Sequence, residues 1–503
     1  MIGVIGMIKG SLRRAAPAVL TAAGALGLAG CAVGPDYEPP ESDGGQWLAP
    51  PDGVTTESLP AEWWSLLEQP EVGGYVEAAL AENRDLRAAV ARVEEARALR
   101  GVAAAALWPR LDAEGSYTWY EQSLNSPGAA SQIISAGLAP RDGEFYNARL
   151  DASWELDLFG ASRRRLEAAD AGSAAAAAAA AGTALSVVAE TVSAWIEYRG
   201  ARKRLAVTRR SVDAQAETLA LTRSKVEIGL ARELDALRAE AELRSTRARL
   251  PALQAAAAAS ADRLAVLTGR TPGEVRAALE GELALPESPA SLPVGLRAEI
   301  LRRRPDVIAA ERELAAATAE VGGATAAFFP RLVLGASGGF EAGDVSNLVT
   351  GDSRTLGIVP FLRWPVFQGG RLRAELRAAE AREHAALARY EGAVLRALAD
   401  AESALAAWAG ERGTLAELRQ ASAAAAAAAD IAARLYEQGL GDFLTVLDAE
   451  RRLAETDDER VRAEIRALLA LVRVYKALGV GTGVGTGVGA GVGIAPGGQG
   501  GTP

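Results

Sequence analysis

The chain has 503 residues and a formal net charge of −10, with 49% hydrophobic and 23% charged residues, a composition typical of a folded protein with a buried core. Only 5% of the residues are aromatic and the apolar share is largely alanine, which favours long, closely packed helices. One histidine, His384, and one cysteine, Cys31, exclude a histidine-rich metal site, a Cys/His zinc site and a disulfide framework. The net negative charge argues against nucleic acid as a partner.

The sequence shows no sign of an enzyme site. His384 lies in a helical stretch and no Gly-x-Ser-x-Gly turn occurs, so we expect no enzyme activity, metal or cofactor.

Residues 1–30 are typical of a secretory signal, because basic residues precede an apolar stretch, Ala15 to Leu28, that is short for a spanning helix. The stretch ends in Leu28-Ala29-Gly30-Cys31, which resembles the bacterial lipobox and implies that Cys31 becomes the lipidated first residue of the mature protein. Ala32 stands where an inner-membrane retention signal usually has Asp, so we expect the outer membrane as destination. Acyl chains can hold a protein there without a spanning helix. The alternative is an ordinary cleaved signal with an incidental cysteine.

An internal repeat organises the chain. Asn83 to Leu111 matches Arg304 to Leu332 with an offset of 221, and Gly229 to Gly269 matches Gly439 to Gly479 with an offset of 210. We therefore expect a lipidated extended arm at 31–60, a first structural repeat at 61–269, a linker at 270–293, a second repeat at 294–479 and a glycine-rich disordered tail at 480–503.

Each repeat predicts a helix, two strands, a long helix and a return helix. The first helix should run from Glu71 to Leu107, ahead of Pro109. Segments 109–159 and 330–367 alternate apolar and polar residues, as barrel strands do between lipid and water, although Pro360 weakens the last strand. The loops within these hairpins, 125–143 and 341–353, should face outside the cell. The alternative is a soluble hairpin packed on helices.

The long helices should run from Ala161 to Ile228 and from Arg371 to Gln438, each of ~68 residues and ~100 Å. Turns at Gly229 and Gly439 should lead into return helices. The stretch from Ala171 to Ala189 is uncharged, but alanine, glycine and serine insert poorly into lipid, so packing as coiled coils is favoured over insertion.

Four strands cannot close a barrel, and open strand edges are not tolerated in lipid, so several copies must associate. Two copies would give eight strands around a filled interior, whereas three would give twelve strands and room for a pore.

Four blocks resemble the TolC-like outer-membrane efflux family in its lipoprotein branch, which includes NodT and OprM: the lipobox with Ala32-Val-Gly-Pro-Asp-Tyr37, Trp154-Glu-Leu-Asp-Leu-Phe-Gly160, Phe367-Gln-Gly-Gly-Arg371, and Gly439 to Leu453. The resemblance covers Cys31 to Gly479. It implies a mainly α fold with a small membrane β-barrel, in which a homotrimer forms a twelve-stranded barrel continuous with a periplasmic α-helical barrel. The trimer would be lipid-anchored in the outer membrane of a Gram-negative bacterium.

The implied function is the exit duct of a tripartite efflux system, with a periplasmic adaptor (membrane fusion) protein and an inner-membrane pump of RND type as partners. One alternative is a protein-secretion duct of the same fold, which would differ only in its inner-membrane partner. The other is a non-conducting periplasmic adaptor, but an adaptor would show one helical hairpin between β-rich halves, whereas this chain shows two helical hairpins and two strand pairs.

The resemblance also implies where the duct closes and docks. Leu444 and Asp448 match the leucine and aspartate that narrow the periplasmic end in this family, and Asp235 points similarly inward by the register of the repeat. Arg238 stands where the first repeat would match Asp448, a departure from a symmetrical acidic ring. Acids around a threefold axis would favour cations; the alternative is that these acids face solvent on a helix. The adaptor should dock at the helix tips, at Gly229, Leu230, Gly439 and Leu440.

Overall fold

The computed structural model describes residues 32–40, 53–55, 57, 60–279, 284–295 and 297–481. The expected signal, Cys31 and the tail from residue 482 lie outside the described residues. The chain divides into two compact units. The strand unit comprises Met1–Pro39, Glu95–Ser173 and Arg312–Ala388, and the helix unit comprises Pro40–Glu94, Ala174–Glu311 and Arg389–Pro503.

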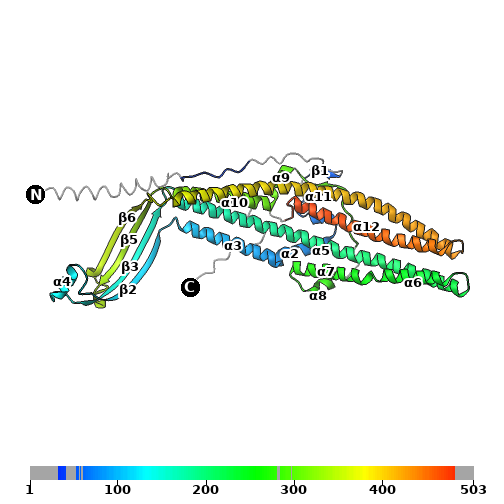
Figure 1. Ribbon diagram of the computed structural model, residues 1–503, viewed down its shortest axis with the longest axis horizontal. Coiled ribbons are helices and arrows are strands. Elements are labelled where there is room, and N and C mark those ends of the chain that lie inside the picture. Colours follow the sequence, from blue (N-terminus) through cyan, green and yellow to red (C-terminus); the bar gives the residue numbers. More distant parts are fainter. Residues whose placement is uncertain are drawn as a thin grey trace. The chain divides into compact units, whose positions relative to one another are not determined.

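The strand unit contains a four-stranded antiparallel sheet (Figure 1), whose strands lie in the order β2 (Arg110–Glu121), β3 (Asp142–Leu156), β5 (Arg331–Ala342) and β6 (Arg354–Arg363). Both predicted hairpins are confirmed. Pro360 lies within β6, an edge strand, where its missing N–H removes no bond from the interior of the sheet.

The predicted alternation gives the sheet one apolar and one more polar face. Leu332 pairs with Leu156 on one side and Leu362 on the other, and these share the apolar face. That face is uncovered, since Leu150 is 51% exposed and Leu362 63%. Strands β2 and β6 have no partner on their outer edges among the described residues, so the single chain forms an open sheet and not a closed barrel.

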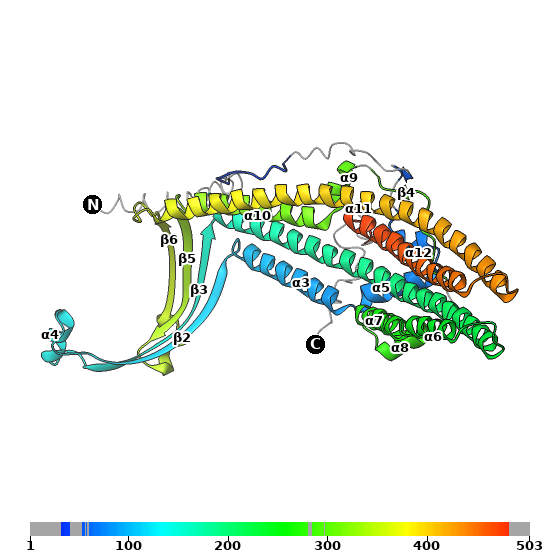
Figure 2. The same ribbon diagram turned by 45° about the vertical axis from the view of Figure 1, so that its right-hand side comes forward.

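The two hairpin loops contain short helices that the sequence analysis treated as plain loop. Helix α4 (Ala129–Ser135) lies at the end of β2 and β3 away from the helices (Figure 2). The second loop has two 3-10 turns, η2 (Val345–Asn347) and η3 (Gly351–Ser353). Asp344 starts η2 by accepting a hydrogen bond from Ser346 N at 2.7 Å, a local capping interaction that competes with irregular loop structure.

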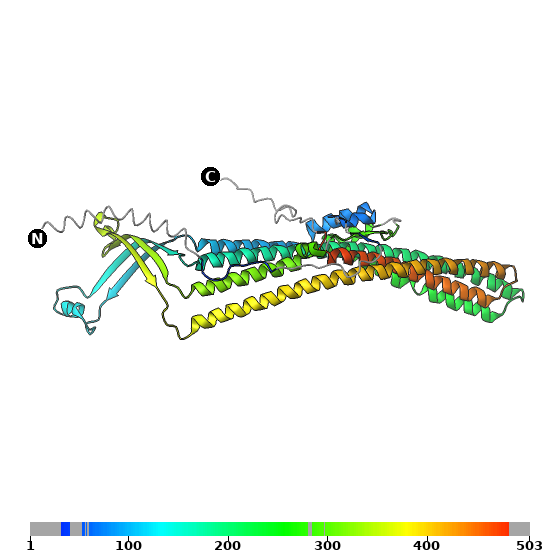
Figure 3. The same cartoon turned by 90° about the horizontal axis from the view of Figure 1, so that it is seen from above.

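The predicted long helices are confirmed as α5 (Ala161–Glu227) and α11 (Arg371–Glu437), each of 67 residues. In the helix unit their return helices run beside them (Figure 3). The second return helix is continuous, α12 (Phe443–Ala477). The first is broken into α6 (Glu233–Arg247) and α7 (Leu250–Thr268), because Pro251 cannot donate the backbone bond that would join them.

The single helix predicted from Glu71 to Leu107 is wrong. Two helices, α2 (Pro70–Glu82) and α3 (Arg84–Ala105), meet at Asn83. Asn83 Oδ1 accepts a hydrogen bond from Leu86 N at 3.0 Å and so caps α3. The second repeat breaks at the matching residue, Arg304, between α9 (Arg297–Arg303) and α10 (Pro305–Ala326).

The segment expected to be a linker, 270–293, is partly folded. It contains α8 (Pro272–Ala278), which begins with a capping box between Thr271 and Glu274. It also contains β4 (Leu292–Pro293), which pairs in parallel with β1 (Val54–Thr55) of the expected arm. Val275 and Leu279 are 0% exposed, so the segment packs on the helix unit.

The helix unit has one large apolar core, in which Trp195 and Trp408 are fully buried and Trp63 stacks on Tyr475 with ring centroids 5.1 Å apart. Trp63 belongs to a 3-10 turn, η1 (Trp63–Leu67). Among the described residues, α5 is the one helix long and apolar enough to cross a membrane by length and composition, and 33% of that apolar window is buried. Its residues Val188 and Val192 are fully buried in the core, which fits the predicted packing between helices.

Candidate functional site

Each long helix ends in a tight turn that leads into its return helix. In the first turn Leu230 N donates to the carbonyl of Lys225 at 2.7 Å, and the equivalent bond in the second turn is 2.9 Å long. Gly229 and Gly439 have φ values of 78° and 71°, which favour glycine at a helix C-terminus. A Cβ at either glycine would meet no atom within 4 Å, so backbone conformation and not crowding favours glycine.

Apolar side chains are exposed at both turns. Ile228 is 69% exposed, Leu230 74% and Leu440 75%. The two turns lie at the same end of the helix unit (Figure 3), and the helices touch just before them, since Lys225 Nζ lies 3.8 Å from the ring centroid of Tyr436 and donates to its carbonyl. The predicted docking residues are therefore accessible, while docking itself stays a prediction.

The predicted gate residues Leu444 and Asp448 line one shallow groove between α12 and α11. The groove has a volume of about 480 Å³, and the small side chains of Ala425, Ala428 and Ala432 leave it open on the α11 side. Leu444 is 43% exposed. An apolar and an acidic side chain are thus brought together on one accessible helix face.

Arg452 also lines this groove, one turn beyond Asp448, and the sequence analysis missed it. The spacing of four residues between an acid and an arginine on a helix was the available signal. The groove therefore carries a guanidinium as well as a carboxylate, which weakens any purely acidic character.

Asp235 lies elsewhere. Its side chain is buried, with the residue 4% exposed, and it does not line the groove of Leu444 and Asp448. Arg232 Nε is 3.3 Å from one carboxylate oxygen and Arg238 Nη1 is 3.9 Å from the other. Arg238, the residue that departs from the repeat, thus counters the charge of Asp235. A gating role for Asp235 stays a prediction.

Glu450 lies on α12 between the groove residues Asp448 and Arg452 and is half-buried against α5. Burial raises the pKa of its carboxyl above the ordinary value, a hydrogen bond donated by Thr218 partly offsets this, and the negative charge of Glu242 adds to the rise. The helix packing near the groove therefore contains an acid that holds its proton more tightly than an exposed one.

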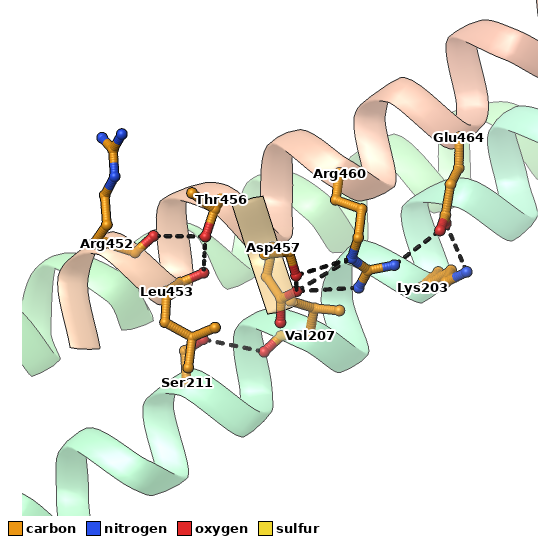
Figure 4. A network of polar contacts seen from close by, with 10 residues as sticks. Lys203, Val207, Ser211, Arg452, Leu453, Thr456, Asp457, Arg460 and Glu464 are labelled. Carbon is orange, nitrogen blue, oxygen red and sulfur yellow. Dashed lines mark hydrogen bonds and ion pairs between the residues drawn. The ribbon is translucent and has the colours of Figure 1, made fainter. Parts of the chain in front are cut away.

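Further along α12, a polar network connects this helix to α5 (Figure 4) and, through Ser422, to α11. Arg460 lies 2.8 Å from Glu464 and 3.2 Å from Asp457. Lys203 of α5 lies 2.6 Å from Glu464, and Ser422 of α11 donates to Asp457 at 2.6 Å. Because each charge has an opposite partner, the network can be partly buried without an isolated charge, and it fixes the register of the three helices.

The arm that follows Cys31 in the sequence is fixed to the strand unit. Arg164, 3% exposed at the start of α5, donates from Nη2 to Asp36 at 2.7 Å and to the carbonyl of Gly34 at 3.3 Å. Ala32 packs at the junction of β3 and α5, where a Cβ added at Gly160 would lie 2.7 Å from Ala32 Cβ. An extended arm was predicted from the sequence, but its contact with Arg164 was not.

A sequence profile described as "Outer membrane efflux protein" matches residues 75–270 and 296–480, the parts of the chain that hold the two repeats. The chain belongs to the outer membrane efflux protein family. The predicted TolC-like family, efflux-channel function and outer-membrane location are confirmed.

Individual relatives of this efflux protein span nearly its whole length. Nodulation protein T of Rhizobium leguminosarum bv. trifolii is 30% identical over 463 residues, covering 90% of this chain and 95% of that protein. Outer membrane protein OprJ of Pseudomonas aeruginosa is 32% identical over 472 residues, covering 91% and 94%. The solved structure of the outer-membrane channel OprN has 37% identity and a TM-score of 0.82, covering 90% of this chain and all of that one. The similar proteins of this family are channels and not enzymes.

Proposed function

We propose that three copies of this chain assemble into a twelve-stranded barrel in the outer membrane, continuous with a periplasmic helical barrel, and that this trimer is the exit duct of a tripartite efflux system. The observation that carries the proposal is the open sheet, which within the described part of the chain has four strands, two unpaired edges and one uncovered apolar face. Such a sheet is stable in lipid only when its edges are paired.

The number of copies follows from the width of the barrel. Eight strands enclose a space that side chains fill, whereas twelve leave an opening. In a closed ring β2 of one copy pairs with β6 of the next, because these are the two edges of each sheet. The polar face then lines the opening, and the apolar face contacts lipid.

The covalent lipid on Cys31 would help to anchor the trimer in the outer membrane, in addition to the barrel strands. Its support is the lipobox together with the fixed position of the residues that follow. Arg164 and Gly160 hold the arm beside the end of β3, so an acyl group one residue ahead of Ala32 would start close to the base of the sheet. Burial of its methylenes adds to membrane affinity.

The partners would be a periplasmic adaptor at the helix tips and an inner-membrane pump of RND type behind it. The support for docking is the exposure of Leu230 and Leu440 beside the glycine turns, since exposed apolar side chains at a defined end of a helical bundle favour contact with another protein. The pump would supply the energy, while the duct conducts passively.

Closure of the duct would depend on Leu444 and Asp448, with Asp235 as a weaker contributor. The support is the shared groove of the first two residues and their one-turn spacing on an accessible face of α12. Three copies around an axis would bring three such faces together. Asp235 could contribute only after release from Arg232 and Arg238.

Cysteine cross-linking tests the assembly directly, because the mature chain has no cysteine besides Cys31. Val359→Cys in β6 is combined in turn with Asp112→Cys, Glu114→Cys or Ser116→Cys in β2, all on the polar face, so that one combination matches the register between copies. We expect oxidation to give a ladder that ends at three chains, and each single variant to give at most one link. Native mass measurement in detergent should give the same count, and planar bilayers should show conductance. A ladder ending at two chains, or a stable monomer, contradicts the proposal.

A further inference from the structure

An arginine-rich hollow lies in the strand unit, where the sheet meets the first turns of α5 and α11. Its volume is about 1070 Å³, and its walls come from β3, β5, β6, α5, α10 and α11. We name it the junction hollow. Three glutamates line it, against six arginines, Arg164, Arg165, Arg331, Arg363, Arg371 and Arg382.

Four of the six arginines pair with acidic residues. Three of them pair with the glutamates that line the hollow, and the fourth, Arg164, pairs with acids outside it. Arg164 is neutralised by Asp36 and Glu167, at 2.7 Å each. The three internal pairs are Arg331 with Glu155 at 4.0 Å, Arg371 with Glu375 at 2.5 Å, and Arg382 with Glu320.

Arg165 and Arg363 remain. Both are exposed, both line the hollow, and neither has an acidic partner in the part of the chain that the structure describes. They come from different elements, the first turn of α5 and the last residue of β6. The junction hollow therefore presents two guanidinium groups whose charge is not compensated by the protein.

Arginines gather at the start of both long helices. The first turns of α5 and α11 contain no acidic residue, although the positive end of a helix dipole favours acids there. Both turns carry arginines instead, in Arg163-Arg164-Arg165 and in Arg371 and Arg373. Asp157, just ahead of α5, caps this helix through Ser162 N and Arg163 N and pairs with Arg163. Glu375 pairs with Arg371, so the positive charge left over in the hollow is that of Arg165 and Arg363.

The strand pairing places the hollow on the polar face of the sheet. Val333 pairs with Glu155 and with Phe361, and Arg331 pairs with Arg363, so these side chains share one face. The opposite face carries Leu156, Leu332 and Leu362. In the proposed duct the leucines contact lipid, and the hollow consequently opens toward the water-filled interior.

Two exposed aromatic side chains line the same hollow. Phe361 is 44% exposed and Trp364 58%, and both line the hollow. Trp364 is held in place because its Nε1 donates to the carbonyl of Phe328 at 3.0 Å. Guanidinium groups bind carboxylate or sulfonate oxygens in pairs, while aromatic rings contact flat apolar bodies.

We propose that the junction hollow binds aromatic organic anions as they pass through the duct, with Arg165 and Arg363 binding the acidic group and Phe361 and Trp364 contacting the rings. This inference rests on the proposed function and specifies the class of solute. It assigns to the duct a binding site for anions that is separate in sequence from the groove lined by Asp448 and Arg452.

The test uses the detergent-purified, full-length protein and naphthalene-1,5-disulfonate as probe. Calorimetry measures probe binding, and planar-bilayer recordings measure block of the current by the same probe. The variant Arg165→Gln/Arg363→Gln removes both free charges. The control, Arg373→Gln/Arg377→Gln, makes the same charge change with exposed arginines of α11 that do not line the hollow.

We expect the parent and the control to bind the probe alike, and the Arg165→Gln/Arg363→Gln variant to bind at least tenfold more weakly and to lose the block. Each single substitution should weaken binding at least threefold, which provides a second measurement if the double variant fails to assemble. Equal binding by parent and double variant, or an equal loss in the control, overturns the inference. So does competition by phosphatidylglycerol in nanodiscs, because it would identify the ligand as a lipid headgroup.

The two proposals fail separately. Conductance without probe binding leaves the duct intact and overturns the anion site. Probe binding that depends on Arg165 and Arg363 in a protein without conductance supports the site and contradicts the duct.

Discussion

Trp154 Nε1 donates a hydrogen bond to the carbonyl of Leu107 at 3.0 Å. The second repeat makes the same contact between Trp364 Nε1 and the carbonyl of Phe328, also at 3.0 Å. In each repeat the indole, near the end of the hairpin, binds the chain just after the helix that leads into it. The start and the end of each hairpin are thereby held together, and the duplication is visible in side-chain contacts as well as in sequence.

Replacing Trp154 by Phe should leave the carbonyl of Leu107 without this partner while keeping most of the ring volume. We expect the free energy of unfolding to fall by about 1 kcal/mol, and Trp364→Phe to have a similar effect. Thermal unfolding followed by circular dichroism in detergent measures the change. Trp119→Phe, in an exposed part of β2, is the control, and an equally large effect there would assign the loss to general strand packing.

Replacing Cys31 by Ser should abolish incorporation of labelled palmitate, because Cys31 is the only cysteine and hence the only site for thioether lipidation. The barrel strands can still insert, so we expect reduced membrane retention and not its complete loss. Metabolic labelling followed by membrane fractionation measures both. Label that persists in the Cys31→Ser protein would exclude the lipobox interpretation.

Replacing Gly439 by Val should distort the second tip, because a β-branched residue is strained at a φ of 71°. We expect weaker capture of the adaptor and lower efflux in cells. Gly410→Val is the matched control, since Gly410 lies inside α11 with open space around it and no positive φ. Unchanged capture and efflux in the Gly439→Val protein would remove this tip from the docking surface.

Replacing Leu444 and Asp448 together by Ala should raise single-channel conductance, because the change removes an apolar and an acidic side chain from one accessible face of α12. Asp448→Asn alone should lower cation preference more than it widens the opening. Planar-bilayer conductance and reversal potentials measure the two effects. If both variants conduct like the parent, the constriction lies elsewhere along the helices.

Replacing Glu450 by Gln should stabilise the protein at neutral pH. Burial raises the pKa of Glu450 above its ordinary value of 4.5, so the folded state binds this proton more tightly than the unfolded state. Its contribution to stability is therefore lost as pH rises from 4.5 through the raised pKa. Thermal midpoints of parent and Glu450→Gln should differ at pH 7.5 and converge toward pH 4.

Glu455→Gln is the control for this pH dependence, because Glu455 is exposed on the same helix. It should change the thermal midpoint little at either pH. A stability difference between parent and Glu450→Gln that is independent of pH would show that shape, and not the proton, matters at this position.

The long helices could be predicted because their signal is local. No proline interrupts 161–228, and the observed end, Glu227, lies next to the glycine turn that was recognised. The break at Asn83 could not be predicted in this way. Asn83 caps α3 and also donates from Nδ2 to the carbonyl of Leu267 at 3.1 Å, a contact between residues 184 positions apart that a scan along the chain does not detect.

The candidate site residues also divide into those that the local sequence indicates and those that depend on distant contacts. Leu444 and Asp448 share a groove because a spacing of four residues places them on one helix face, which sequence alone indicates. Asp235 lies on the same face of α6 as the buried residues Ala239 and Leu243, and which face of α6 packs inside the helix unit is decided by contacts between segments far apart in the sequence. Helix α8 is different again, because its capping box of Thr271 and Glu274 was present in the sequence and was overlooked.

The equal lengths of α5 and α11, 67 residues each, restrict which insertions and deletions these helices can tolerate. Contact between Lys225 and Tyr436 joins the two helices just before their turns, so an insertion of two turns, ~11 Å, in one helix alone would pull this pair apart. The hairpin loops carry no such restriction, and their lengths already differ between the repeats, with α4 in one loop and two short 3-10 turns in the other. Insertions and deletions should therefore accumulate freely in the loops of related genes, whereas in the helices they should occur only as matched pairs.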